Sequence, residues 1–411
     1  MNFKRTKWAC FYTYLAMSSV FSLPPILFLT FREMYGISYT LLGTLVVTNF
    51  CTQLAVDLIF SFFTKYFNAR KTLKIMPVLT SIGLLTYALI PMIVPQHAYA
   101  GLLVGTIIFS IAAGLNEVLL SPTVAALPSD NPDRDMSTLH SLYAYGVTMV
   151  VIVSTVFLKV FGTENWMYLA MFWAMLPLVS FYLFCTSPLP EMELSHGSEK
   201  GTAKKRNISL ALCVLCIFLG SAAENGMTNW ISGYVENALG ISKAMGDILG
   251  LCLFAVLLGL VRTAYAKYGK NISKVLLWSM CGAVVCYLVA ALSQNSVVSM
   301  IACVLTGPFT SMLWPGMLIL MEEKIPAPGV AAYALMAAGG DFGASVAPQM
   351  LGIVVDNVAA SSWAVSLAET FSMTAEQIGM KVGMLTAAIF PILGVIALIF
   401  SLRYFRKAKG E

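Results

Sequence analysis

The stretch Gly114-Leu115-Asn116-Glu117-Val118-Leu119-Leu120-Ser121-Pro122 decides the fold, because it sets an amide and a carboxyl inside an apolar run. That run extends from about Tyr99 to Leu127, which is long enough to cross a bilayer. A carboxyl at membrane depth costs about 2.5–3.5 kcal/mol on insertion scales, so such a residue is a candidate functional site. Loss of water favours the neutral carboxyl, and Glu117 is therefore our candidate proton site. The structural alternative is a protonated Glu117 that is hydrogen-bonded to a neighbouring helix.

The composition indicates a polytopic membrane protein. The 411 residues are 58% hydrophobic and only 11% charged, with a mean hydropathy of +0.80, whereas soluble chains carry roughly 25% charged residues. We find no phosphate-binding G-x-x-x-x-G-K, no H-E-x-x-H and no G-x-S-x-G motif, so we expect no enzyme. The nine cysteines nearly all fall in apolar runs and are interpreted as packing residues. We also expect no cofactor, no metal site, no nucleic-acid partner and a monomer.

Twelve apolar runs predict twelve transmembrane helices in two pseudo-symmetric six-helix bundles. The predicted domains are residues 1–187, a linker at 188–207, and residues 208–411. The predicted helices are roughly 8–31, 39–63, 72–95, 99–127, 137–161, 165–186, 208–234, 243–266, 272–293, 297–321, 330–355 and 379–402. The longest loop is expected between Asp356 and Gln377, with Thr374 as the N-cap of the last helix.

The distribution of Lys and Arg predicts that both termini are cytoplasmic. If they are, all of these residues except Arg32, Lys159, Lys243 and Lys381 fall in inside segments. Arg262 is assigned to one of those inside segments. We therefore predict a multi-pass protein of the cell (inner) membrane, with no Arg or Lys at mid-membrane, which argues against an anionic solute.

Short matches between the halves indicate a duplication. Tyr35-Gly36-Ile37-Ser38 opens helix 2, and Leu239-Gly240-Ile241-Ser242 opens helix 8. Ser121-Pro122, His140 and Gly146 are matched at a constant offset by Trp314-Pro315, Tyr333 and Gly339. Two such halves are expected to enclose a solute site near the midplane and to rock about it. The alternative is chance similarity among apolar helices.

Twelve helices, a basic central loop and paired halves resemble the major facilitator superfamily. The loop signature after helix 2 survives only at its basic end, in Arg70 and Lys71, while Lys65 stands where an Asp is expected. Glu117 with Pro122, Glu224-Asn225-Gly226 with Trp230, and Trp314-Pro315 resemble the fucose permease-like sugar:proton symporters. The resemblance implies that Glu117 binds protons and sugar. The acidic residue of that group in helix 1 is missing here.

Two polar groups lie in otherwise apolar helices. Asn49, Gln53 and Asp57 recur at i, i+4 and i+8, so they share one face of helix 2, which forms either a cavity wall or a contact between helices. Asp57 is also a candidate partner of Arg70 or Lys71. In helix 7, Glu224 and Thr228 are four residues apart, and so are Asn225 and Asn229. This high density of polar residues in an apolar helix predicts an unwound or cavity-lining segment.

The remaining candidates come from helices 4, 5, 7, 10 and 11. Asp341 is either a second proton site or a structural partner. His140 is expected to be an ordinary solvated histidine near the start of helix 5. Aromatic rings can cover the apolar face of a sugar, while amides bind its hydroxyls. The predicted proton-coupling residues are Glu117, Glu224 and Asp341; the predicted solute-binding residues are Asn116, Asn49, Gln53, Tyr143, Asn225, Asn229, Trp230, Trp314 and Tyr333.

The sequence thus predicts a secondary active transporter that works by alternating access. Uptake of a neutral hydroxylated solute such as a sugar, coupled to protons, is the favoured function. Sodium stays open as the coupling ion, because carboxyl and amide oxygens also suit it. The alternative function is a proton-driven exporter of drugs or metabolites. Exporters of the superfamily usually carry a Gly-Pro-rich bend in helix 5, and the segment after Tyr145-Gly146 has no proline.

Overall fold

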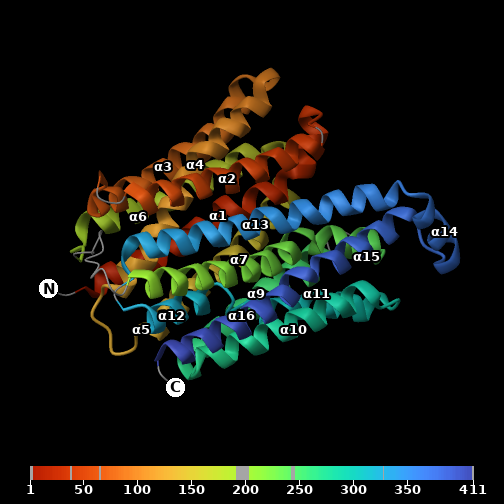
Figure 1. The fold of residues 1–411 in the computed structure, drawn as a ribbon. Coiled ribbons are helices and arrows are strands. Elements are labelled where there is room, and N and C mark those ends of the chain that lie inside the picture. The colour runs from red at the N-terminus through yellow and green to blue at the C-terminus, as the bar shows by residue number, and fades with distance from the viewer. Residues whose placement is uncertain are drawn as a thin grey trace. The chain divides into compact units, whose positions relative to one another are not determined.

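The computed structural model describes residues 3–37, 39–63, 66–190, 203–241, 246–326 and 328–409, and every regular element in these ranges is a helix (Figure 1). In these ranges, ten helical stretches are long and apolar enough to cross a membrane, and the bent pair α13–α14 adds an eleventh. The helix α2, Tyr39–Phe63, has 25 residues and lies where the second transmembrane helix is predicted. The chain is therefore an all-α membrane protein, as its hydropathy predicts.

The chain divides into two compact units of similar size. The first contains residues 1–197 and 327–338, and the second contains residues 198–326 and 339–411. The helix α13, Gly329–Ala359, contributes to both units. The predicted domain limits at 187 and 208 stay a prediction, and positions 191–202 of the predicted linker lie outside the described residues.

The first unit contains six long helices, and its aromatic core ties four of them together. Trp166 is fully buried and meets Phe31 edge-on with ring centroids 4.8 Å apart, and Tyr87 at 6.0 Å. Tyr87 in turn lies 5.7 Å from Phe109. The long helices are α1 Lys4–Tyr35, α2 Tyr39–Phe63, α3 Ala69–Ile93, α4 Ala98–Ala125, α5 Pro132–Phe161 and α6 Trp166–Thr186, with short 3-10 turns at Pro95–His97 and Thr163–Asn165.

The start of α1 is fixed to the start of α5 and to the end of α6. Lys7 forms an ion pair with Asp135, and Thr6 donates a hydrogen bond from its hydroxyl to the Pro188 carbonyl. These contacts bring the first residues of two odd-numbered helices and the end of α6 together. Helices that cross a membrane in alternate directions require that arrangement.

The helices of the second unit are broken more often. The elements are α7 Ala203–Gly233, η4 Tyr234–Ala238, η5 Gly246–Cys252, α9 Leu253–Tyr268, α10 Ile272–Leu292, α11 Ser296–Thr310, α12 Pro315–Lys324, α13 Gly329–Ala359, α14 Ser362–Phe371, α15 Ala375–Ala387 and α16 Ile389–Lys409. Both η4 and η5 are π-helical. The predicted long loop between Asp356 and Gln377 is wrong over most of its length, because α13 continues to Ala359 and α14 forms after it. The predicted cap is confirmed: Thr374 and Gln377 form a capping box.

Two pairs of glycines show that the short sequence matches occupy equivalent places in the two units. Gly36 and Gly240 both have a positive φ, 64° and 68°, and each lies between two helical elements, α1 and α2 in the first unit and η4 and η5 in the second. Gly146 lets α5 approach α1, since a Cβ there would lie 2.7 Å from the Leu15 carbonyl oxygen. Gly339 does the same for α13 and α7, since its Cβ would lie 2.8 Å from Val214. The recurrence of both backbone features favours duplication over chance similarity.

Candidate functional site

The polar stripe of α2 meets Glu117 of α4 inside the first unit. Asp57 has no exposed surface, and one of its carboxylate oxygens lies within 4.8 Å of one of Glu117. Two ionised carboxylates at that distance repel by about 3.5 kcal/mol at an effective dielectric constant of 20. The pair therefore favours a state in which one group carries a proton or a cation lies between them. Arg70, one alternative partner of Asp57, is exposed and donates from Nε to the Pro190 carbonyl at 3.4 Å.

The two amides of the α2 stripe have different roles. The Asn49 Oδ1 atom accepts hydrogen bonds from Ser110 Oγ of α4 at 2.6 Å and from Gln53 Nε2 at 3.0 Å. Asn49 therefore joins α2 to α4. Asn116 Nδ2 donates to the Ala112 carbonyl at 3.0 Å. Within the described part of the chain, the buried Gln53 Oε1 and Asn116 Oδ1 atoms have no hydrogen-bond partner, so they are available acceptors.

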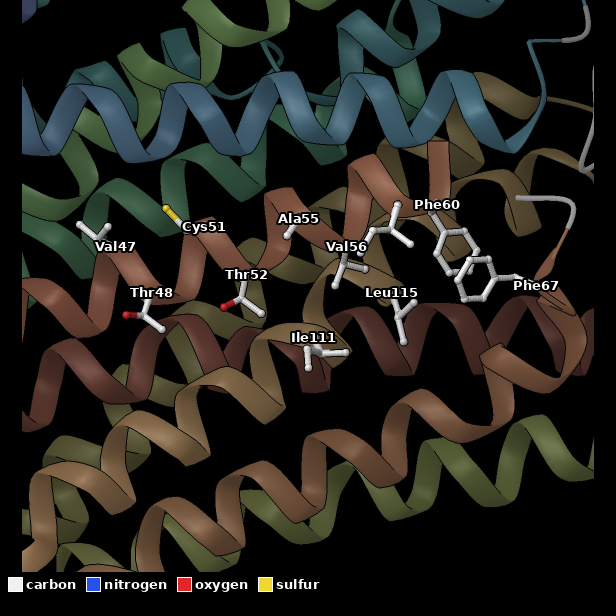
Figure 2. Close-up of a pocket in the computed structure, with 11 residues that line it drawn as sticks. Val47, Thr48, Cys51, Thr52, Ala55, Val56, Phe60, Phe67, Ile111 and Leu115 are labelled. Carbon is white, nitrogen blue, oxygen red and sulfur yellow. The ribbon is translucent and has the colours of Figure 1, made fainter. Parts of the chain in front are cut away.

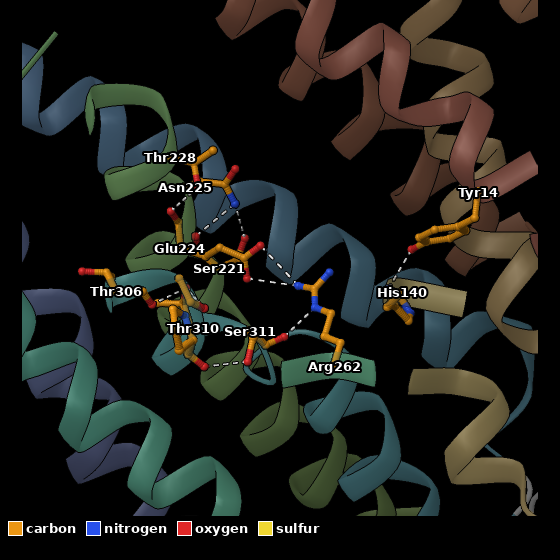
Figure 3. Close-up of polar contacts among 12 residues, drawn as sticks. Tyr14, His140, Ser221, Glu224, Asn225, Thr228, Arg262, Thr306, Thr310 and Ser311 are labelled. Atoms are coloured by element: carbon orange, nitrogen blue, oxygen red, sulfur yellow. Dashed lines mark hydrogen bonds and ion pairs between the residues drawn. The ribbon is translucent and has the colours of Figure 1, made fainter. Parts of the chain in front are cut away.

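His140 of α5 is buried, and the expectation of a solvated histidine is wrong. Its side chain is 2% exposed, its Nδ1 atom lies 2.9 Å from the Tyr14 hydroxyl, and its Nε2 atom lies 3.5 Å from Ser121 Oγ (Figure 3). The reason is that α5 begins at Pro132, so His140 lies two turns inside the helix. Tyr143 is half-buried one turn further on, with its ring edge-on to Tyr14 and Phe21.

A buried ion pair lies at the centre of the second unit. Arg262 of α9 is 2% exposed, and its Nη2 atom lies 3.3 Å from both carboxylate oxygens of Glu224 on α7 (Figure 3). The expected place of Arg262 in an inside segment is wrong, because Arg262 lies within the apolar helical stretch Ile248–Tyr268. The absence of Arg and Lys at mid-membrane stays a prediction. Glu224, predicted as a proton-coupling residue, has a permanent cation beside it. Together the two side chains carry no net charge when both are ionised.

Pro315 provides the second contact of Arg262. In an uninterrupted helix, the Ser311 carbonyl would accept a hydrogen bond from the N–H group four residues on, but proline has none. The chain forms turns from Ser311 to Trp314, and the Ser311 carbonyl accepts from Arg262 Nε at 2.7 Å. The Trp-Pro pair that resembles helix 10 of the symporters thus has a physical role here. It frees a backbone acceptor for a buried guanidinium group.

The polar residues of α7 satisfy one another along the helix. Thr228 donates to the Glu224 carbonyl at 2.8 Å, and Asn229 Nδ2 donates to the Asn225 carbonyl at 2.9 Å. Asn225 Nδ2 donates to the Ser221 carbonyl at 3.1 Å and to its hydroxyl at 3.2 Å. The predicted unwinding of this segment is wrong, because the α-helix continues to Gly233 and changes to π-helix only at Tyr234.

The predicted aromatic residues differ in availability. Trp230 Nε1 donates to the Pro348 carbonyl at 3.1 Å, so its polar edge is occupied by α13. The Trp314 ring covers Gly340, where a Cβ would lie 2.2 Å from it. Asp341, the next residue in α13, is 2% exposed. Tyr333 is 4% exposed, and among the described residues its hydroxyl has no hydrogen-bond partner.

A pocket of about 680 Å³ lies beside α2 and α4 of the first unit, and its lining is almost entirely apolar (Figure 2). Thr48 and Thr52 are the hydroxyl-bearing side chains in it, and none of its lining residues is charged. Asn49, Gln53, Asp57 and Glu117 do not line it. We therefore place the candidate solute contacts among those polar residues and not in this pocket. The lining residues are Val47, Thr48, Cys51, Thr52, Ala55, Val56, Ile59, Phe60, Phe67, Ile111 and Leu115.

Comparison with known families identifies the fold. A model described as Major Facilitator Superfamily matches residues 9–348. The chain belongs to this superfamily. The predicted twelve-helix major facilitator fold is thereby confirmed, and the protein is a membrane transporter by family.

Solved structures of the superfamily align over nearly the whole chain. The E. coli fucose:proton symporter FucP is 14% identical, with a TM-score of 0.69, and the alignment covers 96% of this chain and 99% of that one. The proton:xylose symporter XylE is 14% identical, with a TM-score of 0.72, and the alignment covers 94% of each chain. The human organic anion transporter TETRAN is also 14% identical, with a TM-score of 0.70, and the alignment covers 97% of this chain and 100% of that one. These likenesses establish the fold of the transporter. Curated protein sequences give no match.

Sequence reasoning missed Arg262, although this superfamily member carries a signal for it. The buried positions of α9 include Ala255, Leu258, Gly259 and Ala266, and Arg262 lies on the same helical face. Its helical period therefore assigns it to the interior. The count of Lys and Arg by loop assigned it to the membrane surface. The helical period predicts the burial of Arg262 better than the loop count does, because the position of a residue along the helical turn fixes the direction of its side chain.

Proposed function

We propose that this transporter couples proton movement to the uptake of a neutral hydroxylated solute, such as a sugar, by alternating access. The close approach of Asp57 and Glu117 carries the proposal. A carboxyl pair in which Asp57 is fully buried and Glu117 is half-buried can hold one proton in one conformation and release it in the other, when access to water changes. FucP and XylE are proton symporters of fucose and xylose by name, which agrees with this coupling.

The charges of the second unit support a neutral solute. Arg262 could bind an anion, but Glu224 already balances its charge at 3.3 Å. An anionic solute would have to displace that carboxylate or bring a proton with it. The Gln53 and Asn116 oxygens offer acceptors of the kind that bind sugar hydroxyls. Asn225 and Asn229 stay predicted solute-binding residues. Asp341 and Tyr333 stay predicted site residues.

The test is uptake by proteoliposomes with an imposed inside-alkaline pH gradient and a panel of labelled sugars. Accumulation of one sugar that collapses with a protonophore supports the proposal. Accumulation driven by an inward sodium gradient, with equal pH on both sides, would show that sodium is the coupling ion instead of the proton. Net movement only when the proton gradient is reversed, with drugs or metabolites as cargo, supports the exporter instead.

Glu117→Gln is the sharpest variant, because it keeps the size and hydrogen-bonding capacity of the side chain and removes the titrating group. We expect it to keep solute exchange between equal pools and to lose pH-driven accumulation. Glu164→Gln is the matched control, since Glu164 is exposed in the turn before α6, and it should keep both activities. Normal accumulation by Glu117→Gln would show that Glu117 is structural.

A further inference from the structure

The helix α14, Ser362–Phe371, is an amphipathic element in what the sequence predicts to be a loop. Both of its ends are capped. The Ser361 hydroxyl accepts a hydrogen bond from the Ala364 N–H, and Ser372 adopts the left-handed conformation that ends the helix, with φ 53°. The Met373 N–H then donates to the Ala368 carbonyl at 2.9 Å. The capping box of Thr374 starts the next helix immediately.

Among the residues of α14, all of which the structure describes, Ala364 and Ala368 are the two that are buried. Ala364 and Ala368 are buried one turn apart and pack with Ile378 of α15, and Val358 and Val382 lie against this cluster. The side directly opposite is polar and exposed. It consists of Ser362, Ser366, Glu369 and Thr370.

Beside the buried alanines lies a stripe of large apolar side chains that the protein leaves partly exposed. Trp363, Leu367 and Phe371 follow one another at i, i+4 and i+8, so they share a face of the helix. Their exposed fractions are 47%, 37% and 46%. A helix with a polar side and an exposed apolar stripe that carries Trp and Phe is typical of helices that lie in the membrane interface.

The position of α14 in the fold decides what covers this stripe. The bend between α13 and α14 is 82°, so α14 runs across the direction of a helix that spans the membrane (Figure 1). The helices α15 and α16 form one span, Ala375–Lys407, and three residues separate it from the end of α14. The stripe therefore lies beside the end of that span that is opposite the C-terminus.

We propose that α14 rests in the membrane interface on that face, with Trp363, Leu367 and Phe371 inserted among the glycerol and first methylene groups of the phospholipids. The polar side, with Glu369, faces water. This contact holds the α13–α15 corner at a fixed depth while the transporter changes conformation. The inference is independent of which solute or ion is carried.

Photocrosslinking to lipid tests the orientation of α14. Benzoylphenylalanine is introduced singly at Trp363, Leu367 or Phe371, and at Ser366 or Thr370 as matched positions on the polar side. After illumination in phospholipid nanodiscs, intact mass measures the lipid adduct. We expect at least a fivefold higher adduct yield at the three stripe positions. Equal yields on both sides, or a crosslinked protein dimer in place of lipid adducts, would overturn the proposal.

Fluorescence quenching provides a second test that uses a conservative variant. The difference between the wild-type and Trp363→Phe emission isolates the signal of Trp363 from the other six tryptophans. Brominated phospholipids should quench that difference signal strongly, whereas aqueous iodide should have little effect. Quenching by iodide but not by the brominated lipids would place Trp363 in water and refute the proposal.

Discussion

The ion pair of Arg262 and Glu224 predicts how much stability the protein loses when one of the two charges is removed. Arg262→Met removes the guanidinium group, keeps most of its volume, and leaves the Glu224 carboxyl in an interior site. Side-chain exposures of 3% for Arg262 and 15% for Glu224 put the pair among buried salt bridges. Removing one partner from such a bridge costs about 3–5 kcal/mol, because the other charge stays buried. We therefore expect the melting temperature to fall by about 6–20 °C at pH 7, at 2–4 °C per kcal/mol.

The two single variants should differ in their dependence on pH. In Arg262→Met, Glu224 can take up a proton in the folded state, whereas the unfolded chain ionises it above about pH 4.3. The folded state then binds more protons, so stability falls as pH rises, by up to about 1.4 kcal/mol per pH unit. Glu224→Gln leaves a guanidinium group that cannot lose its proton. Its loss of stability should stay constant between pH 5 and pH 7.

Differential scanning fluorimetry of purified protein in detergent measures both effects. The double variant Arg262→Met with Glu224→Gln should lose less than the sum of the single losses, by about 2 kcal/mol, because no charge stays buried without a partner. Additive losses, or melting temperatures within about 2 °C of wild type for both single variants, would refute the reasoning. A decrease in stability of Arg262→Met on acidification would refute the pH argument.

Three further predictions concern helix contacts and can be checked by the same thermal measurement. Tyr14→Phe should cost about 1–2 kcal/mol, because it removes the hydroxyl 2.9 Å from the buried His140 Nδ1 atom; an unchanged melting temperature would contradict that bond. Gly343→Ala should cost about 1–3 kcal/mol, because its Cβ would lie 2.1 Å from the Phe218 carbonyl oxygen, whereas Gly233→Ala has nothing within 4 Å and should be neutral or slightly stabilising. Pro315→Ala restores an N–H group that competes with Arg262 for the Ser311 carbonyl, so the variant should depend less on Arg262 for its stability. The substitution Arg262→Met should therefore lower the melting temperature of the Pro315→Ala variant by less than it lowers that of the wild type. Equal losses in the two backgrounds would contradict the role given to Pro315.

The candidate site was predictable only where its residues stand close in sequence. Asn49, Gln53 and Asp57 follow helical spacing, and the structure buries all three. The expected role of Asp57 as a partner of Arg70 or Lys71 came from its place in the sequence. The approach of Asp57 to Glu117 depends on how α2 packs against α4, which no local pattern records.

The sequence by itself determined the class of the protein and most of its helices, and it indicated their duplication. Membrane spans require apolar residues along their whole length, because no water satisfies the backbone there, and this requirement is local. The glycines at 36 and 240 mark the same turn in each half for an equally local reason. The tertiary structure alone decided that Arg262 pairs with Glu224, that Pro315 frees a carbonyl for it, that His140 is buried, and that α14 exposes an apolar stripe. These features depend on the partner that each side chain meets from a distant segment, and packing, not spacing, selects that partner.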